Sequence, residues 1–295
     1  MWVCGCGAAK GGTEHMARRC RTRPVALSIA GSDSGGGAGI QADLRAFSFF
    51  GVFGTTALTA VTAQNPKGVT GVAEIPLNVV RKQIEAVLVG FDVRAIKTGM
   101  LYSAPIIEEV AGMLAVRRRV PVVVDPVMIA TSGARLLRED AIRCLCERLL
   151  PLATVMTPNL PEAEAILGSG LSSLRAVRRG ARALAREYGV TVVVKGGHLE
   201  PDGEVAVDVV CDGTRLWEVA APRVQATTTH GTGCSFSAAL AACLARGEAL
   251  MQAIHCAKAY VTGSLASCVR VGRGTYALAS PDELVLADVR VRQVS

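Results

Sequence analysis

The hydrophobic pattern of the chain changes repeatedly between two periods. Short runs of consecutive apolar residues, such as VALSIA at 25–30 and VPVVVDPVM at 120–128, are typical of strands buried on both faces of a sheet. Longer segments lie between them, and at 175–188 apolar residues recur at the i, i+4, i+7 and i+11 spacing of a helix, with arginines opposite. Alternating strands and helices predict an α/β fold with a mostly parallel central sheet covered on both faces.

The same pattern predicts the remaining elements. Further strands are expected at 55–63, 92–100, 153–159 and 191–198. Helices are expected at 40–51, at 77–89, after Ser103 as a cap with Pro105 in its first turn, at about 138–149, from 160 onward, after Cys234, and at about 249–267. An Asp212-Gly213 turn between alternating runs predicts a hairpin over 205–221.

Polar and glycine-rich clusters follow the predicted strands. They read GSDSGGG, AQN, KTGM, DPVM, TPN and KGGH in chain order. Because the carboxyl ends of parallel strands meet at one edge of a sheet, and ligands bind outside that edge, these clusters predict the rim of an active site.

Composition narrows the class of protein. The 295 residues are 50% hydrophobic and 19% charged with a net charge of +7, which suits a large core and an anionic ligand. No run of 18 apolar residues predicts a membrane span. Ten cysteines without a CxxC pair or zinc-type spacing indicate a reducing, cytoplasmic compartment. The basic clusters lack interleaved aromatic residues, which argues against stacking on a single strand. Arginines 117–119 are most simply a solvated face, so we expect no nucleic-acid partner.

The glycines after the first strand leave several interpretations open. Gly37-x-Gly39-x-x-Ala42 nominally matches a dinucleotide fingerprint, but the second strand ends in Gln64-Asn65 without the acidic residue that a ribose needs. A nicotinamide oxidoreductase is therefore disfavoured. The glycines serve either a sharp strand-to-helix turn or a close approach of backbone to a substrate. No Walker pattern is present.

Two acids and an amide at strand ends suit a magnesium site completed by water and substrate phosphates. These residues are Asp125, Asn159 and Glu162. Asn159 and Glu162 also have the spacing of a helix capping box, and both roles can coexist. Lys195, at the end of VTVVVK, is either a strand-end lysine or a phosphate contact.

The segment from Thr229 to Cys234, THGTGC, combines two glycines with a cysteine before a predicted helix. Backbone amides at a helix N-terminus attract anions, and the same dipole lowers the pKa of a thiol, so Cys234 is a candidate base. The alternative is a tight turn followed by a small core residue.

Seven motifs in fixed order, GSDSGGGAGIQADL, TAVTAQN, KTGM, DPVM, TPNLPEAE, VKGGH and THGTGC, resemble the hydroxymethylpyrimidine/phosphomethylpyrimidine kinases of thiamine biosynthesis, in the ribokinase-like superfamily. The resemblance covers about residues 24–276 as one kinase domain. It leaves 1–23 as a disordered or mis-started extension and 277–295 as a tail. It implies a three-layer αβα sandwich, a homodimer, and use of ATP and Mg²⁺ to phosphorylate 4-amino-5-hydroxymethyl-2-methylpyrimidine and then its monophosphate.

The resemblance also implies roles for individual residues. The pyrimidine would be bound by Gln64, Asp43, Met100 and Val127. Gly231, Thr232 and Gly233 would form the anion hole, and Cys234 takes the place where sugar kinases of the superfamily carry an aspartate base. Magnesium would bind Asp125 and Glu162, and ATP would contact Lys195, Asn159 and Thr229. Pyridoxal kinase, on the same scaffold, is the alternative, which Gln64 and Lys195 disfavour.

Overall fold

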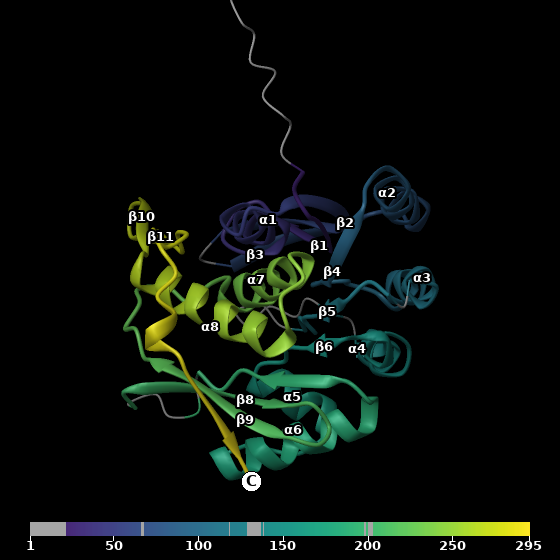
Figure 1. Ribbon diagram of the computed structural model, residues 1–295. Coiled ribbons are helices and arrows are strands. Elements are labelled where there is room, and N and C mark those ends of the chain that lie inside the picture. The colour runs from purple at the N-terminus through teal and green to yellow at the C-terminus, as the bar shows by residue number, and fades with distance from the viewer. Residues whose placement is uncertain are drawn as a thin grey trace, which may run out of the picture.

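The computed structural model describes residues 22–65, 68–117, 119–128, 137, 139–197, 199 and 203–295. All but the last two residues of the predicted N-terminal extension, 1–23, lie outside this set. Among the described residues, no helix is both long and apolar enough to cross a membrane. A ten-stranded sheet with helices on both faces organises the described chain, which confirms the predicted α/β fold (Figure 1).

The centre of the sheet is parallel. Its strands follow the order β2-β1-β4-β5-β6-β7, and each pairs with the next in parallel register. They are β1 (Val25–Asp33), β2 (Phe53–Asn65), β4 (Val93–Thr98), β5 (Val122–Val124), β6 (Val155–Met156) and β7 (Thr191–Val194). β5 and β6 are fully buried and shorter than the apolar runs that predicted them, because the chain leaves the sheet at Asp125 and Thr157.

Antiparallel strands complete both edges of the sheet. β3 (Gly68–Glu74) pairs with β2 at one edge. At the other edge lie β8 (Val205–Cys211) and β9 (Leu216–Pro222), which confirm the predicted hairpin. β12 (Arg290–Val294) adds to β9, so the prediction of a tail over 277–295 is wrong for these residues. An edge strand this exposed needs little apolar signal, since backbone hydrogen bonds hold it.

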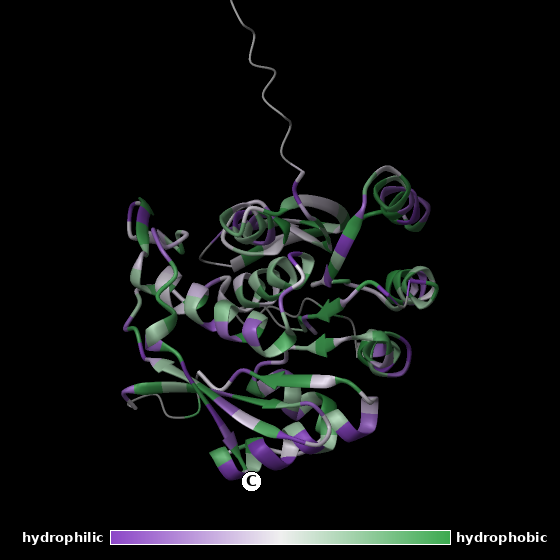
Figure 2. Ribbon diagram, viewed as in Figure 1, coloured by the Kyte–Doolittle hydropathy of each residue, from purple (hydrophilic) through white to green (hydrophobic). Residues whose placement is uncertain are grey.

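Two groups of helices cover the sheet. One face is covered by α2 (Leu77–Gly90), α3 (Ala104–Ala115), α4 (Glu139–Cys144), α5 (Leu160–Leu167) and α6 (Leu174–Tyr188), and the other by α1 (Gly39–Phe49), α7 (Thr232–Ala245) and α8 (Leu250–Ala266). Each face has its own apolar core. Figure 2 shows the apolar side of most helices turned toward the sheet. α7 is apolar almost throughout, because it packs between α1, α8 and the sheet.

Short elements fill the connections. A π-helical turn (Leu145–Leu149) and a 3-10 turn (Leu150–Leu152) follow α4, and β10 (Val269–Gly272) pairs with β11 (Thr275–Ala277) in a separate two-stranded sheet. A further 3-10 turn spans Leu286–Asp288. Ser103 precedes α3 as predicted, but its side chain makes no cap and donates to Glu74 instead.

Candidate active site

The polar clusters that follow β5, β6 and β7 meet at one edge of the sheet. Asp125 directly follows β5, Lys195 directly follows β7, and Asn159 pairs with Lys195 in a parallel bridge. The Lys195 Nζ lies 3.0 Å from Asp125 Oδ1. The clusters that the sequence predicts as an active-site rim therefore do meet at these strand ends, with Lys195 among them.

Asp125 joins the sheet to α7. Its carboxylate is buried, and the Ser237 hydroxyl donates to Oδ2 at 3.1 Å from the second turn of α7. Burial by itself would raise the pKa of Asp125, but the charges of Lys195 and then Lys97 outweigh it and hold the pKa below its usual value. Asp125 therefore stays ionised at neutral pH.

Asn159 and Glu162 form the capping box of α5. The Glu162 amide donates to Asn159 Oδ1 at 2.9 Å, and the Asn159 amide donates to Glu162 Oε2 at 2.8 Å. Burial and the nearby charge of Asp125 raise the pKa of Glu162 to about 7, although Lys195 opposes the rise. Lys195 is thus shared by two buried carboxylates, Asp125 and Glu162. The excess negative charge and the oxygen donors suit Mg²⁺, which would be held by Asp125 and Glu162 with water and phosphate oxygens.

The two roles of Glu162 can be separated, because glutamine also completes a capping box. Glu162→Gln should therefore keep α5 capped while it removes one metal-binding charge. Because the raised pKa of Glu162 lowers stability progressively as pH rises from the usual value of 4.5 to about 7, the variant should melt no lower than the wild type, and its advantage should grow over this interval and stay constant above it. Turnover should fall and require more Mg²⁺. Unfolding followed by circular dichroism at several pH values, with a Mg²⁺ titration of activity, checks both expectations.

A result in which Glu162→Gln lowers the melting temperature but leaves the Mg²⁺ requirement unchanged would contradict this assignment. Glu162→Ala is the matched comparison, since alanine removes the cap and the charge together.

Two glycines at the start of α7 leave little room for a side chain, and only Gly231 excludes one. Gly231 has φ of 87°, and a Cβ there would overlap the Gly37 carbonyl oxygen. A Cβ on Gly233 would lie 3.3 Å from Lys195 Nζ. α7 starts at Thr232, so its first amide groups open beside Lys195, as an anion site requires. The Thr232 hydroxyl donates to the Thr229 carbonyl at 2.9 Å, so these threonines shape the loop.

Cys234 lies in the first turn of α7, but its thiol does not have the low pKa that the sequence predicted. Burial raises the pKa of Cys234 to about 11. Lys97 and a hydrogen bond from the Gly39 amide oppose the rise, whereas the charges of Asp43 and Asp125 add to it. The prediction from the helix dipole is wrong because loss of hydration and two nearby carboxylates outweigh it. The thiol is neutral near pH 7.

Asp43 is fully buried in an ion pair that sequence analysis missed. Lys97 Nζ lies 2.9 Å from both Asp43 oxygens, and the Ser28 hydroxyl also donates to Asp43. Burial would lower the pKa of Lys97, but the charges of Asp43, Cys234 and Asp125 raise it. Asp43, which the resemblance places against the pyrimidine, therefore has no exposed surface in this structure. The signal for Lys97 was a single lysine in the buried strand DVRAIKTGM.

Met100 and Val127 lie together, as expected of two residues that line one pocket. Both pack in a small cluster with Ala60 of β2, separate from the two main cores. Met100 is buried and Val127 is partly buried. Ala60 belongs to β2, the strand that also carries Gln64.

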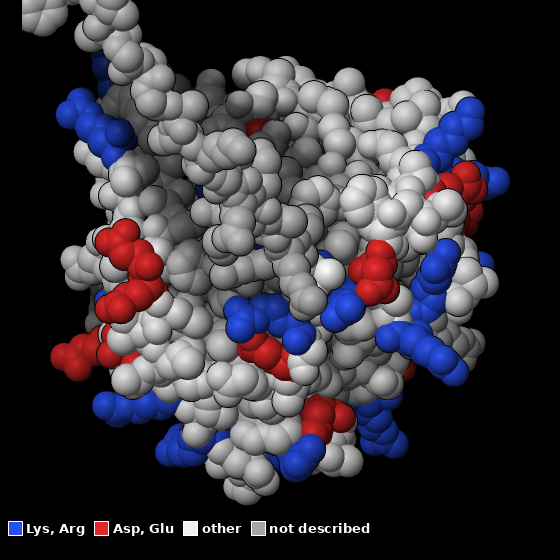
Figure 3. Space-filling model, turned by 45° about the horizontal axis from the view of Figure 1, so that its top comes forward, with Lys and Arg blue, Asp and Glu red and all other residues white. Residues whose placement is uncertain are grey.

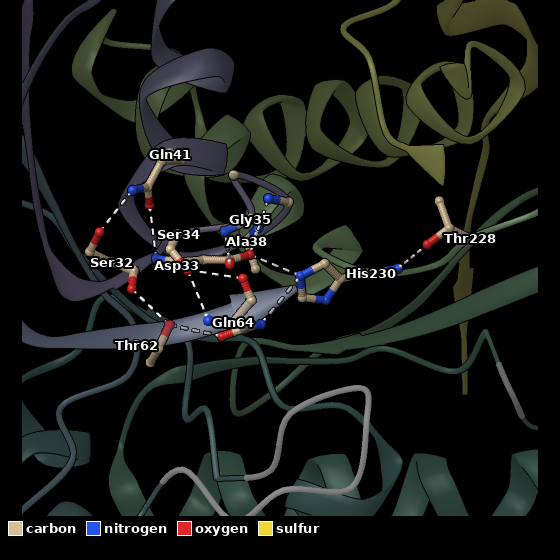
Figure 4. Close-up of polar contacts among 12 residues, drawn as sticks. Ser32, Asp33, Ser34, Gly35, Ala38, Gln41, Thr62, Gln64, Thr228 and His230 are labelled. Atoms are coloured by element: carbon tan, nitrogen blue, oxygen red, sulfur yellow. Dashed lines mark hydrogen bonds and ion pairs between the residues drawn. The ribbon is translucent and has the colours of Figure 1, made fainter. Parts of the chain in front are cut away.

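The Gln64 amide is oriented by its neighbours (Figure 4). The one proton of the Thr62 hydroxyl is shared between the Ser32 carbonyl oxygen at 2.9 Å and Gln64 Oε1 at 3.1 Å, and Gln64 Nε2 faces His230 Nε2 at 3.4 Å. His230 Nε2 lies 2.9 Å from Asp33 Oδ2, so we assign its proton to that bond. A protonated Nε2 cannot accept from Gln64. Among the described residues no acceptor is then left for the Gln64 amide, which can donate to a ligand.

Asp33 organises the loop after β1. Its carboxylate accepts from the amides of Gly35 (2.8 Å), Gly37 (3.1 Å) and Ala38 (2.8 Å) as well as from His230. Burial opposes ionisation, but the His230 and backbone hydrogen bonds outweigh it and lower the pKa of Asp33. His230 and Asp33 thereby join the two glycine loops, a link that distance along the chain hid from sequence analysis.

The glycines of this loop answer the question left open by the sequence. Gly39 has φ of 58°, and a Cβ there would meet the Gly31 carbonyl oxygen at 2.5 Å. The turn interpretation is therefore confirmed at Gly39, where β1 passes into α1.

Known proteins resemble this chain along most of its length. A sequence model described as phosphomethylpyrimidine kinase matches residues 33–279. The hydroxymethylpyrimidine/phosphomethylpyrimidine kinase of Rhizobium meliloti is 47% identical over 85% of this chain and 94% of its own length. The thiamine biosynthesis bifunctional protein ThiED of Geobacter sulfurreducens is 45% identical over 85% of this chain, which spans 51% of that protein.

Solved structures agree with the fold. The pyridoxal kinase of Staphylococcus aureus in complex with ADP has a TM-score of 0.83 at 31% identity, over 93% of this chain and 100% of that one. The phosphomethylpyrimidine kinase of Clostridium difficile has a TM-score of 0.71 at 40% identity, over 81% and 98% of the two chains. The motifs, the fold and these matches agree: this protein belongs to the phosphomethylpyrimidine kinase family.

Proposed function

We propose that the protein uses ATP to phosphorylate 4-amino-5-hydroxymethyl-2-methylpyrimidine and then converts the monophosphate to the diphosphate, both at the strand-end site. The observation that carries the proposal is the Gln64 amide. Its Oε1 lies 3.1 Å from the Thr62 hydroxyl, and its Nε2 lies 3.4 Å from His230 Nε2, in the loop that leads into α7. An amide of this kind can pair with an aminopyrimidine edge, while the loop binds the phosphoryl group that is transferred.

The first turn of α7 and Lys195 would stabilise the transferring phosphoryl group. Backbone amides fixed at a helix N-terminus need no reorganisation when negative charge develops, and a buried lysine strengthens the effect. Asp125 and Glu162 would hold Mg²⁺. When bound, this ion neutralises charge on the phosphate oxygens. Asn159 and Thr229 support the site through the α5 cap and the Thr229 carbonyl, and we propose that both also approach ATP.

Cys234 is proposed to accept the proton of the substrate hydroxyl. Lys97 lies close enough to lower the free energy of the thiolate. In the absence of substrate, burial has the larger effect and raises the pKa of the thiol. Lys97 and Asp43 do not touch the substrate in this account. Asp43 holds Lys97 in place, and Lys97 brings its positive charge close to Cys234.

Gln64→Met should test whether Gln64 recognises the pyrimidine ring of the substrate. Methionine keeps a similar length and removes both amide hydrogen-bonding groups, so the KM for the pyrimidine should rise roughly 10–100-fold, with a far smaller change for ATP. Steady-state kinetics with each substrate varied in turn measures this. Equal losses for both ligands would argue against recognition of the ring. Gln83, which bonds both backbone groups of Leu58, gives a matched glutamine control outside the site.

A second activity on pyridoxal is also supported by a specific observation. Pyridoxal kinases of S. aureus and Bacillus subtilis share the fold at TM-scores of 0.83 and 0.80. Pyridoxal, like the pyrimidine, is a flat six-membered aza-ring that bears a hydroxymethyl group. We propose it as the weaker substrate, since the Gln64 amide suits the aminopyrimidine edge.

We further propose that the protein is a cytoplasmic homodimer. β3 leaves the edge of the sheet exposed, and Val61 of β2 and Val72 of β3 are 40% and 36% exposed. Sedimentation equilibrium should give twice the chain mass of 30.7 kDa. A mass of one chain at micromolar concentration would refute the dimer.

On the face shown in Figure 3, basic and acidic side chains of the described residues are interspersed, which gives no continuous basic surface for a nucleic acid.

The direct test of the two-step reaction is its stoichiometry. Each molecule of pyrimidine alcohol should yield two of ADP, with the monophosphate and then the diphosphate seen by mass spectrometry. A reaction that stops at one ADP would remove the second step from the proposal.

A further inference from the structure

A second group of potential metal ligands lies at the opposite end of α7 from the active-site loop. It consists of Cys243 in α7, Glu248 in the α7–α8 turn and Cys256 in α8, and we call it the Cys-Glu-Cys cluster. One ligand atom from each residue lies within 4.8 Å of the other two. None of the three takes part in the proposed reaction.

The end of α7 explains why Cys243 and Glu248 meet. Gly247 has φ of 85°, its amide donates to the Leu244 carbonyl at 2.9 Å, and the Glu248 amide donates to the Cys243 carbonyl at 3.1 Å. These two bonds define a Schellman motif, which brings the side chains of its first and last residues together. That contact is usually apolar. Here it joins a fully buried thiol to a carboxylate, an arrangement that packing alone does not require.

Cys256 completes the cluster from the neighbouring helix. α7 and α8 pack side by side (Figure 1), and Cys256 is 6% exposed on the inner side of α8. Its Sγ lies 3.7 Å from Glu248 Oε2. In a tetrahedral zinc site, metal–sulfur bonds of about 2.3 Å and metal–oxygen bonds of about 2.0–2.2 Å place two ligand atoms about 3.5–3.8 Å apart. The separation of Cys256 Sγ from Glu248 Oε2, which in the metal-free cluster is that of a hydrogen bond donated by the thiol, already falls in this range.

Surrounding side chains hold the ligands in place. Arg246 Nε lies 3.1 Å from Glu248 Oε1, which leaves Oε2 to face the thiols. Gln252, one turn before Cys256, donates from Nε2 to Cys256 Sγ at 3.6 Å. Supporting hydrogen bonds of this kind orient the ligands of protein metal sites. The Glu248 side chain is 22% exposed, so the cluster is open to solvent on one side.

From this geometry we propose that Cys243, Glu248 and Cys256 bind one divalent metal ion of borderline softness, with Zn²⁺ as the best match. Two thiolates and one carboxylate select Zn²⁺ over Mg²⁺, which prefers oxygen ligands only. Three protein ligands leave the fourth position of the tetrahedron to water. Each thiol gives up its proton on binding, and the positive charge of Arg246 offsets the third negative ligand. The ion would fasten the end of α7 to α8.

Co²⁺ is the direct probe, because a thiolate–Co²⁺ bond absorbs in the near ultraviolet and a tetrahedral site absorbs strongly in the visible. Full-length wild-type protein, reduced and freed of metal, should bind one equivalent with both absorptions, and Zn²⁺ should displace it. Cys243→Ser and Cys256→Ser should each abolish the thiolate band. Cys211→Ser, a buried thiol on β8 outside the cluster, and Cys234→Ser, at the active site, should both retain it.

Three results would overturn the proposal: no thiolate band in the wild type, an equal band in Cys243→Ser, or loss of the band in Cys234→Ser. Should the serine variants fail to fold by circular dichroism, Glu248→Gln decides the matter. Glu248 is partly exposed, and its replacement should weaken Zn²⁺ binding roughly tenfold or more. Unchanged binding would contradict the site. Because the readout is metal binding, it is independent of the proposed kinase reaction.

Discussion

Replacement of Cys234 by alanine is expected to lower kcat by roughly 10²–10⁴-fold, the range for loss of a general base, with little change in the KM for ATP. Cys234 lies in the first turn of α7, between the Gly39 amide and Lys97. Alanine should fit this position, so the fold should persist. Steady-state kinetics and a circular dichroism spectrum together check the expectation.

The pH profile separates a base from a packing residue. Burial raises the pKa of Cys234 to about 11. Below that pH, the thiolate fraction increases about tenfold each time the pH rises by one unit. If the thiolate accepts the proton, wild-type kcat should rise with pH through the neutral and mildly alkaline range. Cys234→Ala should lose this slope. Near-normal turnover with an unchanged slope would show that the thiol only packs and that a phosphate oxygen takes the proton.

Replacement of Lys97 by methionine is expected to lower the free energy of unfolding by roughly 3–5 kcal/mol, the cost of leaving one member of a buried ion pair without its partner. The side chains of Lys97 and Asp43 are both fully buried, and Asp43 then retains only the Ser28 hydroxyl and water that must enter the core. Urea unfolding measures the difference. Activity should also fall, since Lys97 is the positive charge beside Cys234.

A double variant makes this prediction sharper. Lys97→Met with Asp43→Leu removes both charges, and a well-packed apolar pair should recover much of the stability but not the activity. Arg81→Met breaks the pair that the mostly exposed Arg81 makes with the partly buried Glu109, and should change stability much less than Lys97→Met. A Lys97→Met protein as stable as the wild type would mean that Asp43 is held neutral instead.

Local patterns predicted the scaffold well. The apolar period distinguished the strands from helices such as α6, the Asp212-Gly213 turn located the β8–β9 hairpin, and the spacing of Asn159 and Glu162 predicted the capping box. Each of these depends on residues close in sequence. The convergence of polar clusters on one edge followed from the single premise of a parallel sheet.

Features that depend on tertiary packing were not predictable in the same way. The His230–Asp33 bond joins residues 197 positions apart, and neither motif indicates it alone. The Cys234 thiol was assigned from the helix dipole, but its burial next to two carboxylates is visible only in the fold. β12 is an exposed edge strand, so backbone pairing places it without an apolar pattern. The burial of Lys97 was not predictable either, because the partner that permits it, Asp43, lies 54 residues away in the sequence.

The most direct test of the central claim compares substrates on the purified wild-type protein. ADP release should be measured with the pyrimidine alcohol, pyridoxal and pyridoxine as separate substrates, at fixed ATP and Mg²⁺. We predict a clearly higher kcat/KM for the pyrimidine alcohol, with pyridoxal as a weaker substrate. A higher kcat/KM for pyridoxal or pyridoxine would contradict it and assign the site to the pyridoxal kinase branch of this fold.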